Sequence, residues 1–421
     1  MTGRYFTLNV IIRKNQIEAA HGLDIGEDET QLHSVETVSA FRQAVLEGWP
    51  EGKVTWALSW EALTDPSSRY QDIRRLVREY RQAYGDDVTY FLGGYFANAY
   101  SPREKVRREL HLGLQKVREV MGVSPESVIA GFLSAQNMKW LAEEEGIHVC
   151  QGTIWSQFSI DNQDGEGSVC YPYYPSIQHF CKPAQSPSDQ VDCVNLDGWT
   201  VDFLAARRPG FEGGFNSRMG IGPIETLGAF PPETAMEEIE AVTKTHFGQE
   251  NLDRNGFGFL TVAWEIALVT QIGRLDCLTR WLRWMKDTWP DAQMLTEGGF
   301  GLLWRAHHKD NCGLRYHFVQ QGTGIGGSDE DKQIKWFQTQ AFRLALLKDL
   351  NTGEEQVIDF TRYDTDAKEP EGLTRHWSLM GDLNQKGTRP QDKPRSFREL
   401  PDEWQRLILQ AVPELDKRRS E

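Results

Sequence analysis

The sequence lacks several features that would assign it to a well-defined class. Its cysteines form no CxxC motif, and no histidine pair has HxxxH or HExxH spacing, so no standard zinc motif is present. No apolar run approaches the roughly 20 residues of a membrane span. The start, MTGRYFTLNVIIRKNQ, lacks the basic region and cleavage site of a signal peptide. We therefore expect a cytoplasmic protein, or a secreted or periplasmic one if a signal has been removed.

The six cysteines are too few and too scattered for a small disulfide scaffold. They are Cys150, Cys170, Cys181, Cys193, Cys277 and Cys312. Free thiols are the default expectation for such spacing, and a Cys170–Cys181 bridge is the alternative.

Positive charge is in deficit. The chain has 46 Lys and Arg against 61 Asp and Glu, which gives a net charge of -15. This balance argues against nucleic acid or an anionic membrane as the main partner. It suits an enzyme that acts on neutral small molecules or sugars, and it leaves open whether the protein is a homo-oligomer. The fourteen tryptophans could stack on sugar rings or fill the core.

Strand-like and helix-like patterns alternate over the first three hundred residues. Apolar, β-branched runs predict strands, and amphipathic runs with Ser or Gly at their ends predict helices. The predicted strands are 5–12, 53–60, 87–96, 127–133, 147–155, 191–199 and 257–264, and the predicted helices include 34–49, 67–85, 101–122, 134–146, 231–247 and 274–290. Such alternation indicates a parallel α/β barrel or sheet.

Two stretches depart from this alternation. Residues 156–190 form a long loop whose aromatics favour an ordered lid. After about residue 308 the pattern becomes that of an antiparallel β region followed by a polar tail with one helix near 401–412. We expect a barrel domain over 1–308 and a C-terminal β region with a wrapping tail over 309–421. GTGIGGSD, residues 322–329, lacks the lysine of a phosphate-binding loop and is interpreted as a glycine-rich β turn.

Several long stretches carry a resemblance to a known family. They are KVTWALSWEAL, VIAGFLSAQNMKWLAEEEGIHVCQGTIWSQ, VNLDGWTVDFLAARR and GTGIGGSD. The chain resembles, nearly end to end, an uncharacterised bacterial family similar in fold to polysaccharide deacetylases, and distantly to family 57 and family 38 glycoside hydrolases. The resemblance implies an α/β fold: an incomplete (β/α)7-type barrel with a small C-terminal β region.

The residues that serve deacetylases as metal ligands and acids are changed here. The acidic pair after strand one is replaced by Arg13–Lys14–Asn15, and the two metal-binding histidines after strand three by GGYFANAY. The deacetylases also carry a catalytic histidine at the end of the last strand, and the corresponding place in this chain is near Trp264–Glu265. No cofactor and no metal ligands are predicted, although a divalent metal remains an open alternative.

Active sites of parallel barrels lie at the carboxyl ends of the strands. That rule selects Glu265 and Asp197 as catalytic carboxylates. Glu265, inside the apolar run FGFLTVAWEIALV, is the candidate acid, and Asp197 the ionised partner. The alternatives are an ion pair of Glu265 with Arg218 or Arg207, and an Asx turn formed by Asp197 before Gly198.

Further strand-end and loop residues complete the candidate site. Glu225 is a third candidate carboxylate, or a residue that stabilises its loop. The predicted substrate-binding residues are Trp60, Gln136, Asn137, Trp155, His179, Trp199 and Trp264. Together they predict a carbohydrate-active enzyme, foremost a hydrolase of glycosidic bonds. The alternatives are a metal-dependent carbohydrate deacetylase with rearranged ligands, such as His179, Asp197 and Glu265, and a non-catalytic glycan-binding protein.

Overall fold

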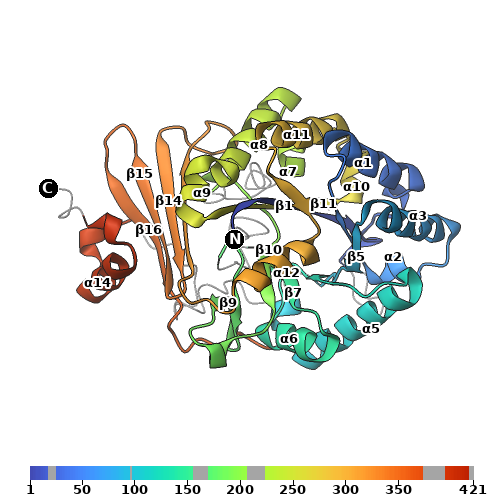
Figure 1. Ribbon diagram of the computed structural model, residues 1–421, viewed down its shortest axis with the longest axis horizontal. Coiled ribbons are helices and arrows are strands. Elements are labelled where there is room, and N and C mark those ends of the chain that lie inside the picture. The colour runs from blue at the N-terminus through green and yellow to red at the C-terminus, as the bar shows by residue number, and fades with distance from the viewer. Residues whose placement is uncertain (18–24, 95–96, 155–168, 206–222, 373–393, 417–421) are drawn as a thin grey trace.

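A ring of parallel strands forms the body of the protein (Figure 1). The computed structural model describes residues 1–17, 25–94, 97–154, 169–205, 223–372 and 394–416. The ring strands are β1 (Gly3–Ile12), β4 (Thr55–Leu58), β5 (Asp87–Tyr90), β6 (Val128–Ile129), β7 (Val149–Thr153), β10 (Val194–Asp197) and β11 (Phe257–Glu265). Each lies near a strand predicted from the sequence, because buried parallel strands are continuous apolar runs.

The strands form two sheets that combine into one barrel. One sheet has the order β11-β1-β4-β5, and the other has the order β10-β7-β6. A parallel bridge between Phe91 and Ile129 continues the first sheet into the second. On the other side, the Thr200 amide donates to the Thr261 carbonyl oxygen at 2.9 Å, without a regular strand pair. The fold is therefore the expected incomplete (β/α)7-type barrel.

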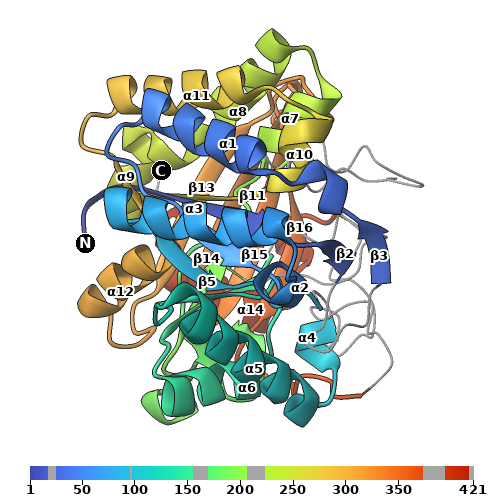
Figure 2. The same cartoon turned by 90° about the vertical axis from the view of Figure 1, so that its right-hand side faces the viewer.

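Helices cover the outside of the barrel, as the sequence predicts (Figure 2). The longer ones are α1 (Val35–Gly48), α3 (Ser68–Tyr84), α5 (Arg103–Met121), α8 (Pro232–Phe247) and α11 (Leu275–Thr288), and the shorter ones are α2 (Trp60–Thr64), α4 (Ala97–Tyr100), α6 (Ala135–Trp140), α7 (Pro223–Ala229), α9 (Gln249–Asn255) and α10 (Ile266–Gln271). Ser34 caps α1 in a capping box, and Gly85 ends α3 in the left-handed conformation.

The two ends of the barrel are closed differently. Helix α12 (Glu297–His307) follows the short strand β12 (Gln293–Leu295) and contacts β1, β7 and β10. The hairpin of β2 (Asn15–Ile17) and β3 (Ile25–Asp28) lies at the opposite end, beyond the carboxyl end of β1 (Figure 2). Close packing of α12 depends on Gly301, since a Cβ there would lie 2.4 Å from Val149. We refer to the carboxyl ends of the strands, where the β2–β3 hairpin lies, as the mouth of the barrel.

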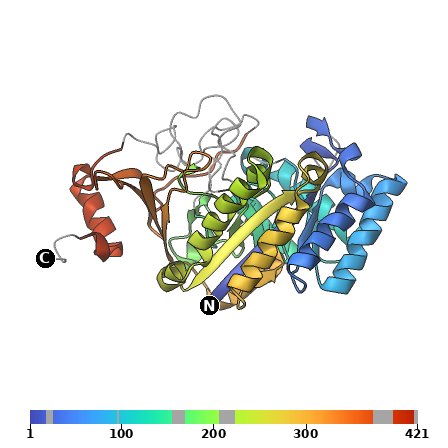
Figure 3. The ribbon, with the colours of Figure 1, turned by 90° about the horizontal axis from the view of Figure 1, so that it is seen from above.

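An antiparallel sheet follows the barrel, as the sequence predicts. Its strands are β13 (Arg315–Gln321), β14 (Lys332–Thr339), β15 (Phe342–Asp349) and β16 (Glu355–Arg362), paired in chain order. Helix α14 (Asp402–Ala411) packs on its outer side, at the far end of the molecule from α3 (Figure 3). A fully buried ion pair, Arg343 with Asp359 at 3.0 Å, joins β15 to β16.

The described part of the long loop packs between the barrel and this sheet. Residues 169–184, which include the hairpin of β8 (Pro175–Ser176) and β9 (His179–Pro183), are largely buried. The Tyr171 hydroxyl accepts the Phe259 amide at 2.9 Å, and the Tyr316 hydroxyl donates to the Pro172 carbonyl oxygen at 2.7 Å. These aromatics therefore contribute to the core and not to the expected lid.

Two further expectations concerned a disulfide bridge and membrane-spanning helices. All six cysteines are free, so Cys170 and Cys181 do not form a bridge. Among the described residues, no helix is both long enough and apolar enough to span a membrane.

Candidate functional site

The inside of the mouth has a mainly apolar floor. Ile11, Ala57, Phe91 and Ile129 form a buried cluster, with Ala263 packed against it. A cavity of about 20 Å³ lies at this level and is lined by Asn9, Ile11, Phe91, Ile129, Gly131, Gln151, Ile154, Gly198, Trp199 and Ala263. This is where the carboxyl ends of parallel strands place an active site.

Three charged side chains meet above the end of β1. Both Nε and Nη2 of Arg13 donate to the Glu29 carboxylate at 3.0 Å, and Nη2 also donates to Oε2 of Glu265 at 2.8 Å. One guanidinium nitrogen therefore holds two carboxylates beside each other. The Glu265 side chain is 23% exposed and that of Glu29 is 11% exposed, while Arg13 is almost covered. Glu29 and Arg13 were not among the site residues predicted from the sequence, because Arg13 and Glu265 are 252 positions apart in the chain.

Burial sets the electrostatics of this cluster. Desolvation raises the pKa of Glu29, although its hydrogen bonds with Arg13 lower it, and the nearby Glu265 charge raises it further. Burial and the Arg13 charge lower the pKa of His33, which lies close by, to about 4, so that imidazole is neutral at pH 7. Two carboxyl groups and a neutral imidazole thus lie around Arg13.

A second ion pair lies on the neighbouring side of the mouth. Lys14 Nζ contacts Asp65 Oδ2 at 2.7 Å, next to α2, the helix that begins at Trp60. Trp60 is partly exposed. The adjacent residues Arg13 and Lys14 are therefore both salt-bridged.

Asp197 ends β10 and is buried. It is 1% exposed, and its Oδ1 accepts the Gly198 amide at 2.9 Å, a local contact of the kind expected for a turn. Trp199, two residues later, is partly exposed and lines the cavity. Burial and, second, the charge of Asp197 raise the pKa of the Cys170 thiol, so Asp197 lies near the loop that packs between the barrel and the C-terminal sheet.

The predicted substrate contact of Trp264 does not fit its position. Trp264 is fully buried and packs against Phe41 of α1, with ring centroids 5.7 Å apart. Side chains alternate along a strand, so Ala263 lines the cavity and Glu265 reaches Arg13 while Trp264 points to the helices. We therefore assign Trp264 to the core.

Gln136, Asn137 and His179 lie near a carboxylate from the C-terminal segment. Glu369 accepts the Ala135 amide at 3.1 Å and the Phe180 amide at 3.2 Å, next to Gln136 and His179 in the chain. Gln136 is exposed, whereas Asn137 and His179 are buried. Burial lowers the pKa of His179 to about 3, so it is a neutral side chain in the core. Glu369 thereby links the segment after β16 to the barrel.

Some candidates lie outside the described residues. They are Trp155, Arg207, Arg218 and the side chain of Glu225, whose backbone belongs to α7.

A buried carboxyl pair, which the sequence analysis did not find, lies beside the glycine-rich turn. Asp202 accepts the Leu204 and Ala205 amides at 2.8 and 2.7 Å and the Ser328 hydroxyl at 2.8 Å. Glu238 of α8 lies next to Asp202 and accepts the Thr323 hydroxyl. Burial and the Asp202 charge raise the pKa of Glu238 to about 9, so Glu238 keeps its proton. The sequence 322–329 is thus a turn fixed to the barrel by carboxyl groups.

Metal-binding groups are not gathered in the described part of the chain. There, no cluster of three or more His, Cys, Asp or Glu side chains is arranged to hold a metal ion.

Comparisons with known proteins identify the family. The model of DUF3863, a domain of unknown function with a solved structure, matches residues 1–338, and that of DUF3864, described in the same words, matches residues 343–415. A crystal structure from Parabacteroides distasonis, provisionally named a glycoside hydrolase/deacetylase, is 42% identical, covers 98% of each chain and has a TM-score of 0.91. No curated protein matches.

Two further solved structures are weaker likenesses. A provisionally named polysaccharide deacetylase from Mycobacterium smegmatis is 16% identical, with 73% of this chain and 91% of that chain covered and a TM-score of 0.41. A family 57-type branching enzyme from Pyrococcus horikoshii is 13% identical, with coverages of 69% and 68% and a TM-score of 0.41. The chain belongs to the DUF3863 family, with a DUF3864 region at its C-terminal side.

Proposed function

We propose that the protein is a carbohydrate-active hydrolase that cleaves glycosidic bonds at the barrel mouth. The observation that carries the proposal is the placement of two carboxylates, Glu29 and Glu265, on one nitrogen of Arg13. Glycoside hydrolysis needs two carboxyl groups on either side of the scissile bond. The provisional name of the 42% identical relative supports the same class of chemistry.

The two carboxyl groups have different environments. Glu29 is the more buried, and its raised pKa suits a group that protonates the leaving oxygen. Glu265, the candidate acid from the sequence, is the more exposed of the two, so we assign it instead to activating water or attacking the sugar. Arg13 keeps both groups in position. Asp197 is the candidate second carboxylate from the sequence, and its variant is compared with that of Glu29.

The surroundings suit a neutral sugar. Trp199 and Trp60 present partly exposed rings, on which the apolar faces of sugar rings can stack. The apolar floor below them binds CH groups, while the charged rim binds hydroxyls. A carbohydrate made of cyclic sugar units is the expected substrate.

The test is turnover of nitrophenyl glycosides by purified variants. We expect Glu265→Gln and Glu29→Gln each to lower kcat by about 10² or more. Glu27→Gln, on the exposed part of the same hairpin, is the matched control and keeps wild-type turnover. Asp197→Asn distinguishes the sequence-based pair from the pair at Arg13. Undiminished turnover in both Glu265→Gln and Glu29→Gln would refute the proposal.

A deacetylase is the second candidate, favoured by the other half of the relative's provisional name. It requires a metal or another way to activate water for attack on an acetyl group. Metal analysis of protein purified without chelator, with acetate release from acetylated oligosaccharides, distinguishes the two reactions. Binding of glycans without any turnover would instead favour a glycan-binding protein.

A further inference from the structure

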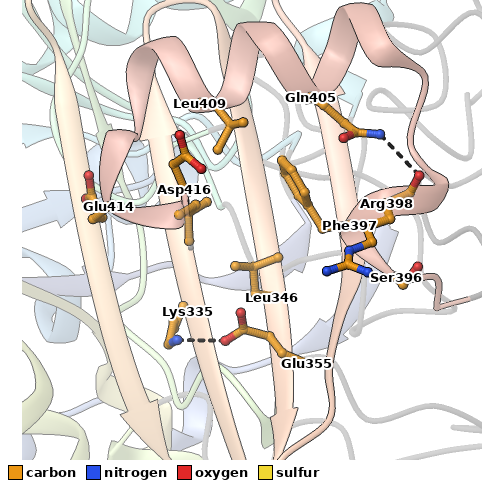
Figure 4. A pocket seen from close by; sticks show the side chains of 11 residues that line it. Lys335, Leu346, Glu355, Ser396, Phe397, Arg398, Gln405, Leu409, Glu414 and Asp416 are labelled. Carbon is orange, nitrogen blue, oxygen red and sulfur yellow. Dashed lines mark hydrogen bonds and ion pairs between the residues drawn. The ribbon is translucent and has the colours of Figure 1, made fainter. Parts of the chain in front are cut away.

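A groove lies under helix α14, on the sheet (Figure 4). Helix α14 is at the opposite end of the molecule from the barrel helices α1 and α3 (Figure 3). Its volume is about 420 Å³, which is within the usual range of small-ligand sites. One wall is formed by Lys335, Leu346 and Glu355, from β14, β15 and β16. The opposite wall belongs to the segment 396–416, which includes α14 and the turns before and after it.

The floor of the groove is apolar. Leu346, Phe397 and Leu409 point toward one another across it (Figure 4). Leu346 is buried in the sheet core, whereas Phe397 and Leu409 are partly exposed. A partly exposed aromatic ring beside aliphatic side chains is a surface for the CH face of a ligand.

The rim carries polar groups with unused hydrogen-bonding capacity. Lys335 Nζ and Glu355 Oε2 form an ion pair at 2.6 Å, with side chains 26% and 18% exposed. An ammonium has three donors and a carboxylate about four acceptor positions, so this single contact leaves most of them for a ligand. The Gln405 amide nitrogen donates to the Arg398 and Leu400 carbonyl oxygens, at 3.1 and 2.7 Å, which holds that side chain at the groove.

The charges of the rim disfavour an anionic ligand. The lining of the groove has more acidic than basic side chains. The acidic ones are Glu355, Glu414 and Asp416, and the basic ones are Lys335 and Arg398. Glu355 is paired with Lys335 and Glu414 with Arg315, so no cluster of positive charge is available to a phosphate or sulfate. Donors and acceptors that alternate around an apolar floor instead match a neutral molecule with many hydroxyl groups.

We propose that this groove is a second carbohydrate-binding site, which takes a short neutral oligosaccharide. The groove binds its ligand without catalysing a reaction, and its binding does not depend on hydrolysis at the barrel mouth. Phe397 and Leu409 contact the sugar rings, and Lys335, Glu355 and Gln405 bind their hydroxyls.

Isothermal titration of the full chain tests the proposal with cellotetraose, xylotetraose, chitotetraose and maltotetraose, each at up to about 10 mM. We expect at least one of them to bind. Leu409→Arg, which fills the groove, and Lys335→Met, which removes the donor, lower that affinity about tenfold or more. Leu302→Arg, the same change at an exposed leucine of α12, is the control and leaves binding unchanged.

Two measurements distinguish binding in the groove from activity at the barrel mouth. Glu265→Gln retains the binding that Leu409→Arg removes, and Lys335→Met retains turnover of nitrophenyl glycosides. Binding lost in Leu409→Arg with no turnover in the wild type would support the groove and refute the proposed hydrolase. If no oligosaccharide binds, or if binding is the same in Leu409→Arg, the groove is not a carbohydrate site.

Discussion

Arg13 Nη2 donates to Glu265 Oε2 at 2.8 Å, across the join between the first and last strands of the barrel. The acid in FGFLTVAWEIALV therefore has an ion-pair partner. That partner is Arg13, which also holds Glu29. Arg13 therefore forms a structural ion pair and also holds the two carboxylates close together at the mouth.

The first prediction concerns Arg13. Arg13→Met removes the counter-charge of Glu29 and Glu265 while keeping an apolar stem. Breaking a buried ion pair leaves uncompensated charge, so we expect the free energy of unfolding at pH 7 to fall by about 3 kcal/mol. Urea unfolding measures the change. Arg75→Met, at an exposed arginine of α3, serves as the control and changes stability little. Equal stability of both variants would show that the contact is not a buried pair.

The second prediction concerns Glu297, which is fully buried under the cavity. Asn9 Nδ2 donates to its Oε2 at 3.1 Å, and burial raises its pKa from 4.5 to about 7. The folded state therefore holds this proton more tightly than the unfolded state, and stability is lost as pH rises from 4.5 through 7. Glu297→Gln removes that loss. We expect the variant to gain stability relative to wild type between pH 4.5 and pH 8 in thermal unfolding. A constant difference between the two proteins over this range would contradict the prediction.

The third prediction concerns Glu238 and Asp202. Burial and the neighbouring charge raise the pKa of Glu238 from 4.5 to about 9, so stability from this pair is present at low pH and is lost as pH rises through 9. Glu238→Gln keeps a hydrogen-bond donor without a titrating proton. We expect its Tm to exceed that of wild type by about 3 °C or more at pH 10 relative to pH 5. Glu240→Gln, on the same helix and more exposed, should show no such difference.

The fourth prediction separates two tryptophans that the sequence analysis grouped together. Trp199→Ala removes a ring from the mouth, so we expect KM for a glycoside to rise about tenfold with a small change in Tm. Trp264→Ala leaves a cavity beside Phe41, so we expect a loss of about 3–5 kcal/mol in stability. Kinetics and denaturant unfolding of both variants provide the check. The reverse pattern would place Trp264 in the binding site.

The sequence by itself determined the alternation of strands and helices and several of their ends. Ser34, Ser67 and Gly85 act within one or two turns of chain, so their roles as caps follow from neighbouring residues alone. The barrel strands are continuous apolar runs, and this local composition predicts that they are buried on both faces.

Tertiary structure decided which side chains meet. Glu265 and Arg13 are 252 positions apart, and Asp202 and Ser328 are 126 apart, so closure of the barrel and docking of the sheet bring them together. The direction of Trp264 depended on the strand register, since a shift of one residue exchanges inside and outside. The loop aromatic Tyr171 became core because Tyr316 and Phe318 of the second sheet pack against it. Local pattern fixes an element and its apolar face, but only the packed chain fixes its partners.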